Sequence, residues 1–208
     1  MFLSRVEIPW EAARNPYDFH RQLWRLFPGE EKEARRNSDE ERQGFLFRVE
    51  ESGSGRAARL LVQSHQAPEI AQGLVMLGTR EIRPAPSAGQ RLAFLLTANP
   101  IKTIVDAERN AKPGKKSEKC RVPLIREEEQ RDWLARKLAG VAEVEAVTLL
   151  THRPLYFRKG NRAGKLATAT YEGVLRVVDP SKLGDMLKNG IGPAKAFGCG
   201  LMLVRRIS

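Results

Sequence analysis

Three side chains capable of acid–base and phosphate chemistry lie close together near the start of this 208-residue chain: Tyr17, His20 and Arg21. Histidine exchanges protons near neutral pH, because its reference pKa is about 6.5. Tyrosine can donate or orient a proton, and arginine can stabilise a phosphorane with paired hydrogen bonds. These groups suit metal-free RNA cleavage, in which a ribose 2′-hydroxyl loses its proton and the adjacent phosphorus gathers negative charge. A histidine at a helix edge is also commonly an ordinary surface residue, so this second interpretation stays open.

The stretch NPYDFHRQLWRLFP, residues 15–28, predicts a helix over 16–27 that carries the three side chains. Asn15 can cap this helix and Pro16 suits its first position. At 100° per residue, Tyr17 and His20 lie one turn apart on one edge. We expect the core face of the helix to consist of Phe19, Leu23, Leu26 and Phe27.

The charge of the chain is unevenly distributed. Residues 150–208 hold 11 Lys and Arg against 3 Asp and Glu, which supplies +8 of the net charge of +11, whereas residues 1–89 are neutral. A basic excess of this kind favours a polyanionic partner, because each phosphate contact releases condensed counterions. It can also serve solubility alone.

The composition limits the location and the cofactors of the protein. No apolar run approaches the roughly 18–20 residues of a membrane span, and we expect no signal peptide in the first ten residues, which lack a basic start and a long apolar stretch. Cys120 and Cys199 are too few and too far apart for a disulfide framework or a zinc site. We therefore expect a cytoplasmic protein with no membrane partner, no metal and no cofactor.

The order of predicted elements repeats along the chain. An uncharged segment rich in Pro, Ala and Ser, residues 84–90, separates two units that each read strand, helix, strand, strand, helix, strand. This order predicts an α+β protein with tandem ferredoxin-like (RRM-like) βαββαβ domains, 1–86 and 87–208. The expected helices are 16–27, 67–74, 126–141 and 180–190; the expected strands are 2–8, 45–51, 58–66, 75–84, 91–100, 144–159, 165–178 and 199–207, with a basic excursion at 103–121.

The segment GIGPAKAFGCG, residues 190–200, resembles a phosphate-binding loop only in part. Its glycines allow close backbone approach and consecutive N–H groups can bind anions. The GK[ST] ending of a P-loop is missing, as is the position of a dinucleotide fingerprint after a strand. The sequence therefore leaves two roles equally open for these glycines: they could bind phosphate, or they could allow a tightly packed turn between a helix and a strand.

Several blocks in fixed order resemble the CasE family of CRISPR-associated endoribonucleases, subunits of the Cascade complex within the RAMP superfamily. The blocks are NPYDFHRQLW (15–24), ANPIKT (98–103), CRVPLI (120–125), EGVLRVVDP (172–180) and GIGPAKAFGCGL (190–201). The charged loop at 29–44 is longer than expected for that family, but it lies outside these blocks.

The resemblance implies two ferredoxin-like domains and cleavage of precursor CRISPR RNA at the 3′ base of each repeat hairpin. It further implies a metal-independent 2′-OH attack that leaves a 2′,3′-cyclic phosphate, with the CRISPR RNA product retained. The catalytic residues would be His20, Tyr17 and Arg21, and the partners would be the repeat hairpin and other Cascade subunits, foremost the adjacent backbone subunit. The candidate RNA-binding residues, from the resemblance and from the basic runs, are Arg25, Lys102, Lys112, Lys115, Lys116, Arg158, Lys159, Arg162, Lys165, Gly192 and Lys195.

Two other functions remain open from the residues alone. A non-catalytic subunit could use the same basic surface to bind an RNA hairpin, and it would yield no cyclic phosphate. A small-molecule enzyme could use 190–200 as its phosphate loop, and it would bind nucleotides without RNA. We expect neither His65 nor His152 to be catalytic, because each lies at a strand end among ordinary polar residues.

Overall fold

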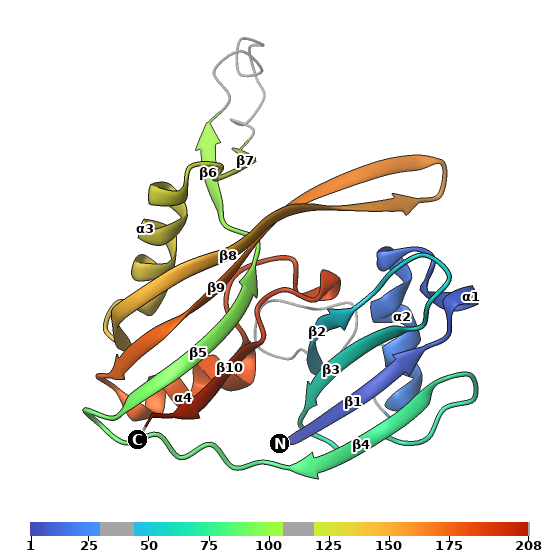
Figure 1. Cartoon of the computed structure of the whole chain (residues 1–208), viewed down its shortest axis with the longest axis horizontal. Helices are drawn as coiled ribbons and strands as arrows, with labels where there is room; N and C mark the ends of the chain where they lie inside the picture. The colour runs from blue at the N-terminus through green and yellow to red at the C-terminus, as the bar shows by residue number, and fades with distance from the viewer. Residues whose placement is uncertain (30–43, 106–118, 208) are drawn as a thin grey trace, which may run out of the picture.

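Two four-stranded antiparallel sheets follow one another in the computed structural model, which describes residues 1–29, 44–105 and 119–207 (Figure 1). Their strands are β1 (Phe2–Ile8), β2 (Phe45–Glu51), β3 (Ala58–Ser64) and β4 (Val75–Glu81), then β5 (Arg91–Ala98), β8 (Ala142–Lys159), β9 (Arg162–Val177) and β10 (Met202–Arg206). The orders are β2–β3–β1–β4 and β10–β5–β9–β8. In each sheet the first strand lies between the third and the last, as in a ferredoxin-like fold. The predicted α+β, tandem ferredoxin-like fold class is confirmed.

The helix predicted over 16–27 is present as three consecutive short pieces. They are the 3₁₀ turn η1 (Pro16–Asp18), the α-helix α2 (Phe19–Leu23) and the 3₁₀ turn η2 (Trp24–Leu26). Asn15 caps the first piece as expected, since its side chain accepts a hydrogen bond from the Tyr17 N–H at 3.3 Å. A preceding turn of helix, α1 (Trp10–Ala13), was not predicted.

The predicted helix over 67–74 is wrong, because this segment runs without regular helix between β3 and β4. The Glu69 N–H donates to the carbonyl of Leu26 at 2.8 Å, and the Leu74 N–H closes a turn onto Ala71 at 3.1 Å. The backbone hydrogen bonds of this segment therefore go to the helical segment of the first unit and to a local turn. Gly73 has a positive φ of 77°, which breaks the helical pattern.

The second unit contains both predicted helices, α3 (Glu127–Leu138) and α4 (Pro180–Asn189). Asp179 caps α4 by accepting a hydrogen bond from the Lys182 N–H at 3.0 Å. The 3₁₀ turn η4 (Lys195–Phe197) follows in the glycine-rich loop.

A separate two-stranded hairpin occupies the ends of the predicted basic excursion. It consists of β6 (Ile101–Val105) and β7 (Lys119–Pro123), and Figure 1 shows it projecting beyond the second sheet. Sequence periodicity did not reveal these strands, because they are short and bury little apolar surface. The candidate residues Lys112, Lys115 and Lys116 lie outside the described residues, as does most of the charged loop at 29–44.

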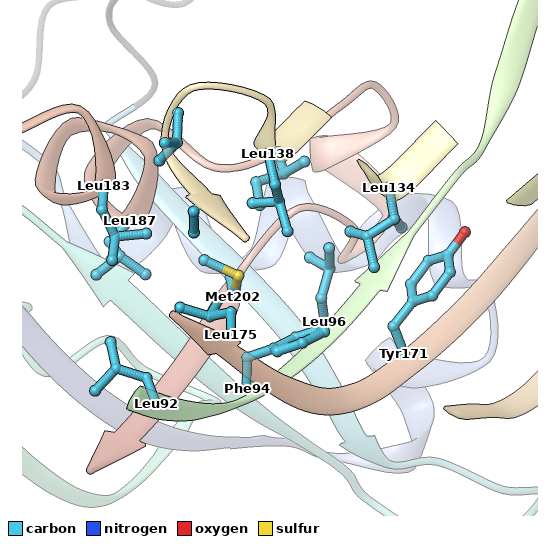
Figure 2. Close-up of a cluster of buried hydrophobic side chains, with 14 of the residues drawn as sticks. Leu92, Phe94, Leu96, Leu134, Leu138, Tyr171, Leu175, Leu183, Leu187 and Met202 are labelled. Atoms are coloured by element: carbon cyan, nitrogen blue, oxygen red, sulfur yellow. The ribbon is translucent and has the colours of Figure 1, made fainter. Parts of the chain in front are cut away.

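Each unit has its own hydrophobic core. In the first, the predicted face of Phe19, Leu23, Leu26 and Phe27 is buried to 2% exposure or less and packs on the first sheet. Figure 2 shows the core of the second unit, where Leu134 and Leu138 of α3 and Leu183 and Leu187 of α4 face Phe94, Leu96 and Leu175 of the sheet. No helix within the described ranges is long and apolar enough to cross a membrane.

The two units meet through close contacts between the first sheet and the C-terminal segment. The Gln63 side chain donates a hydrogen bond to the Leu187 carbonyl at 2.7 Å. A Cβ on Gly190 would lie 2.9 Å from the methyl carbons of Leu46, so glycine is needed for this approach. The predicted domain boundary between residues 86 and 87 lies in the extended connection between β4 and β5, and it stays a prediction.

We expect Gly173→Ala to lower the free energy of unfolding by about 1–3 kcal/mol, because the added methyl group overpacks the second sheet. A Cβ at this position would lie 2.1 Å from the Ala146 carbonyl oxygen and 2.9 Å from the Phe94 ring. Chemical denaturation measures the change. Gly184→Ala in α4 is the matched control: no heavy atom lies within 4 Å of its Cβ, and alanine favours helix by about 0.5–1 kcal/mol. Equal stability of the two variants would contradict this packing.

Candidate active site

His20 lies on α2 with its imidazole half-buried against three aromatic rings. The ring centroid lies 5.2 Å from that of Phe45, 5.8 Å from Trp24 and 6.5 Å from Phe47. This burial lowers the pKa of His20 below its ordinary value of 6.5, since the charged imidazolium loses hydration. At neutral pH the imidazole is therefore uncharged and can accept a proton.

An open hollow of about 420 Å³ lies beside the imidazole. Its lining consists of His20, Arg21, Trp24, Arg25 and Pro28. Two guanidinium groups and a neutral imidazole thus share one concave surface, which suits an anionic group such as a phosphate next to a proton-donating hydroxyl. The structure brings the candidates His20, Arg21 and Arg25 together here.

The two arginines of the hollow have different partners. Arg21 is exposed and forms an ion pair with Asp18 at 2.9 Å. Arg25 donates to the Gln22 side-chain oxygen at 2.9 Å and also to the carbonyl of Gln72. An exposed ion pair contributes little to stability, so Arg21 can exchange Asp18 for a phosphate at small cost.

Tyr17 lies apart from this hollow, where three segments of the chain meet. Its ring stacks on Phe157 of β8 with centroids 6.0 Å apart and planes inclined by 15°, and it lies 6.0 Å from Phe197 of η4. The Lys159 ammonium lies 5.9 Å from the centre of the Tyr17 ring. The Tyr17 ring therefore connects the helical segment to both RNA-binding candidates of the second unit, the long hairpin and the glycine-rich loop.

The long hairpin formed by the ends of β8 and β9 carries Arg158, Lys159, Arg162 and Lys165, all exposed. Figure 1 shows this hairpin reaching from the second sheet across to the helical segment of the first unit. Its end is attached there by Asn15, which donates to the Arg158 carbonyl at 2.8 Å and accepts from the Arg158 N–H at 3.0 Å. The hairpin cations are thereby held beside the helical segment that carries His20.

The glycine-rich loop is shaped by packing at the positions that the structure describes. Gly192 has φ 76°, and a Cβ there would lie 2.8 Å from the Trp133 ring, so this glycine allows the loop to pack on α3. The N–H groups of residues 191, 197, 198, 199 and 200 donate to carbonyls within the fold and are not available to an anion. Lys195 is half-buried in η4. Phosphate binding by Gly192 and Lys195 stays a prediction.

Other candidates lie away from His20. Lys102 on β6 forms an ion pair with Glu129 at 3.2 Å, in the hairpin that projects beyond the second sheet. His65 is exposed directly after β3, and the side chain of His152 lies outside the described part of the structure. A larger hollow, about 970 Å³, lies between the first sheet and β10, and none of the predicted site residues lines it.

Residues 1–206 match the model of a protein family described as CRISPR associated protein. The chain belongs to this family. It is 40% identical to the CRISPR system Cascade subunit CasE of Escherichia coli K12, over 97% of this chain and 98% of that protein. It is 34% identical to the CRISPR-associated endoribonuclease Cse3 of Thermus thermophilus, over 91% of this chain and 90% of that protein.

Solved structures of CRISPR-associated proteins are similar to this structure over nearly the whole chain. The crystal structure of the CRISPR-associated protein Cas6e from Escherichia coli K-12 has a TM-score of 0.84 and 38% identity, with 100% of both chains covered. The Thermus thermophilus Cse3 structure bound to an RNA representing a pre-cleavage complex has a TM-score of 0.76 and 30% identity, covering 98% of each chain. The resemblance to the CasE family drawn from the sequence blocks is confirmed.

Three residues of this CRISPR-associated protein join the site without having been predicted for it. Asn15 was expected only to cap a helix, and Phe157 and Phe197 were not singled out. The sequence signal for Phe157 is its spacing from Gly164: the two residues lie at equal distances from the turn at 160–161, so they pair across the strands, and the ring covers the glycine. Within the described residues, no three His, Cys, Asp or Glu side chains are grouped so that they could hold a metal ion.

We expect the pKa of His20 to lie below 6.5 and to rise towards that value in Trp24→Ala, because removing the indole lets water reach the imidazole. An NMR titration of the imidazole signals, assigned with His20→Ala, measures the change. Trp10→Ala is the control, since this ring lies against Arg14 instead. A His20 that titrates at or above 6.5 in the unaltered protein would contradict the effect of burial.

Proposed function

We propose that this protein is a metal-independent endoribonuclease that cleaves precursor CRISPR RNA at the 3′ base of the repeat hairpin and retains the product. The observation that carries the proposal is the half-buried imidazole of His20 beside two guanidinium groups in one open hollow. Family membership supports RNA as the substrate class. The relatives are named as an endoribonuclease and as a Cascade subunit, and one was solved with an RNA in a pre-cleavage complex.

In the proposed reaction the ribose 2′-hydroxyl gives its proton to His20 and its oxygen attacks the adjacent phosphorus. The phosphorus–5′-oxygen bond then breaks, leaving a 2′,3′-cyclic phosphate on one product and a 5′-hydroxyl on the other. A lowered pKa suits His20 to the role of base, because the proton acceptor must be uncharged at the start. Arg21 and Arg25 stabilise the charge that gathers on the phosphorane. The 5′-oxygen takes up a proton from solvent water, and His20 gives the 2′-hydroxyl proton back to solvent, so that the imidazole is neutral again after the reaction.

Tyr17 supports this reaction through its position. Its ring is held between Phe157, Phe197 and the Lys159 ammonium, and it is 37% exposed. We assign it the role of fixing the helical segment against the hairpin, with its exposed edge available to an unpaired base.

In the proposed complex the cations of the long hairpin bind the phosphates of the RNA stem. An A-form duplex has a deep, narrow major groove, so proteins follow its phosphates and its shape more than its base edges. Lys159, Arg162 and Lys165 are exposed on a hairpin that is fixed at its base by the pairing of β9 with β5 and near its end by Asn15. Lys102, Lys112, Lys115, Lys116, Gly192 and Lys195 would extend this contact along the RNA. Assembly with other Cascade subunits, foremost the adjacent backbone subunit, would keep the product in the complex.

We expect His20→Ala to reduce the single-turnover cleavage rate by about 10²–10⁴-fold, because the proton acceptor is removed. Binding of the hairpin should be nearly unchanged, since the imidazole is one of many groups on the RNA-binding surface. The assay uses repeat RNA from the same genome in EDTA, followed by analysis of the product ends for a 2′,3′-cyclic phosphate.

Two controls accompany this test. A 2′-deoxy substitution at the cut should abolish cleavage, because the attacking oxygen is missing. Salt-sensitive hairpin binding without a cyclic phosphate at any protein concentration would replace the proposal with a non-catalytic RNA-binding subunit. Strict dependence on magnesium would contradict the mechanism.

We expect Lys159→Ala combined with Arg162→Ala and Lys165→Ala to weaken hairpin binding and to flatten its salt dependence. The slope of log Kd against log salt should fall by about 1 for each phosphate contact removed. Filter binding at several salt concentrations measures the slope. Lys182→Ala with Lys188→Ala on α4 is the charge control, and an equal effect of both sets would mean that the hairpin has no special role.

A further inference from the structure

The Asn15 side chain uses both ends of its amide at once. Its Oδ1 accepts from the Arg158 N–H at 3.0 Å and the Tyr17 N–H at 3.3 Å. Its Nδ2 donates to the Arg158 carbonyl at 2.8 Å and to a carboxylate oxygen of Asp18 at 3.1 Å. Both donors and both acceptor positions of the amide are therefore occupied. Asn15 binds the main chain of Arg158 as a neighbouring strand would.

These hydrogen bonds join parts of the chain that are 143 residues apart. On one side lies the helical segment in which Tyr17 and His20 follow Asn15 by two and five residues. On the other side lies the end of β8, where Arg158 stands between Phe157 and Lys159. The stacking of Tyr17 on Phe157 lies next to the amide contact, so the hairpin end is held at two adjacent points.

We propose that Asn15 is a positioning residue that couples the RNA-bound hairpin to the orientation of His20. The inference rests on the proposed function, in which the hairpin holds the stem and His20 takes the 2′-hydroxyl proton. Asn15 touches no reacting atom. It sets the distance and the angle between the surface that holds the RNA and the imidazole that acts on it.

This role separates binding from cleavage. When the hydrogen bonds between Asn15 and Arg158 are removed, the hairpin keeps its cations and still binds the stem, but the scissile linkage is no longer fixed relative to the imidazole. Misplacement of about 1 Å costs about 10²-fold in rate, because in-line attack tolerates little error. The effect should therefore appear in the cleavage rate and leave the affinity unchanged.

Asn15→Asp separates the capping of the helix from the attachment of the hairpin. Aspartate caps a helix as well as asparagine does, so the hydrogen bond from the Tyr17 N–H is retained. A carboxylate cannot donate to the Arg158 carbonyl, and it also repels Asp18. Asn15→Ser is a second variant, because serine caps equally well and adds no charge. Asn161→Asp, at the exposed turn of the hairpin, adds the same charge near the RNA without touching the attachment and serves as the matched control.

The test measures single-turnover cleavage at saturating protein, hairpin affinity and thermal unfolding for all three variants. We expect Asn15→Asp and Asn15→Ser to cleave about 10- to 100-fold more slowly than the unaltered protein. Their Kd should stay within about threefold of that of Asn161→Asp, and thermal unfolding checks that all three variants are folded at the temperature of the assay.

The outcomes that overturn the inference differ from those that overturn the proposed function. Asn15 variants that cleave as fast as Asn161→Asp, or whose slower cleavage is fully explained by weaker binding, overturn the coupling role while leaving the endoribonuclease proposal intact. An unaltered protein that binds the hairpin and never cleaves it overturns the proposed function and this inference together. An Asn15→Ser protein that cleaves slowly below saturation and at the unaltered rate at saturation would likewise count against coupling, since it would show only a loss of affinity.

Discussion

The contact between the end of the long hairpin and the helical segment of the first unit is the interaction on which the candidate site depends. It holds the hairpin cations beside the helical segment that carries His20. The ring of Phe157 covers Gly164 on the neighbouring strand, which fixes the ring on the hairpin before it meets Tyr17. Aromatic pairs of this kind add about 0.5–1.5 kcal/mol beyond the area that they bury. Ring stacking and the Asn15 hydrogen bonds thus stabilise the same contact. The stacked rings contribute apolar packing, and the hydrogen bonds fix the orientation of the hairpin end.

The partial burial of His20 determines both the protonation state of its imidazole and the access of a substrate to it. On one side the imidazole faces Phe45, Phe47 and Trp24, and on the other it borders the hollow with Arg21 and Arg25. Full exposure would leave the group partly protonated at neutral pH, and full burial would keep it from any substrate. The same Phe45 and Phe47 belong to the core of the first unit, so the ring orientation is tied to the stability of that core.

Local patterns were sufficient to predict most of the fold and to place Tyr17, His20 and Arg21 on one helical segment. The buried face of Phe19 and Leu23, the cap at Asn15 and the order of most elements along the chain follow from periodicity and capping rules acting on neighbours in sequence. The helix expected over 67–74 was wrong because Glu69 bonds to Leu26, a tertiary contact that local propensity does not contain. The attachment of Asn15 to Arg158 was not predictable for the same reason. The glycine-rich loop was not predictable from local patterns either. Gly192 packs closely against the Trp133 ring, and no spacing rule places this ring beside it.

The contact between the hairpin end and the helical segment also limits where along an RNA such a protein can act. A basic hairpin alone would bind any duplex, because phosphate contacts carry no sequence information. The hollow beside His20 requires a ribose and a phosphate that can align for attack, which a stacked and paired strand resists. Under the proposed function, with the hairpin fixed to the helical segment, both requirements would be met together only where a stem ends and the strand leaves it unpaired. The choice of the cut would then follow from the fixed separation between the hairpin cations and the imidazole, with base-specific contacts confined to the nucleotides that leave the stem.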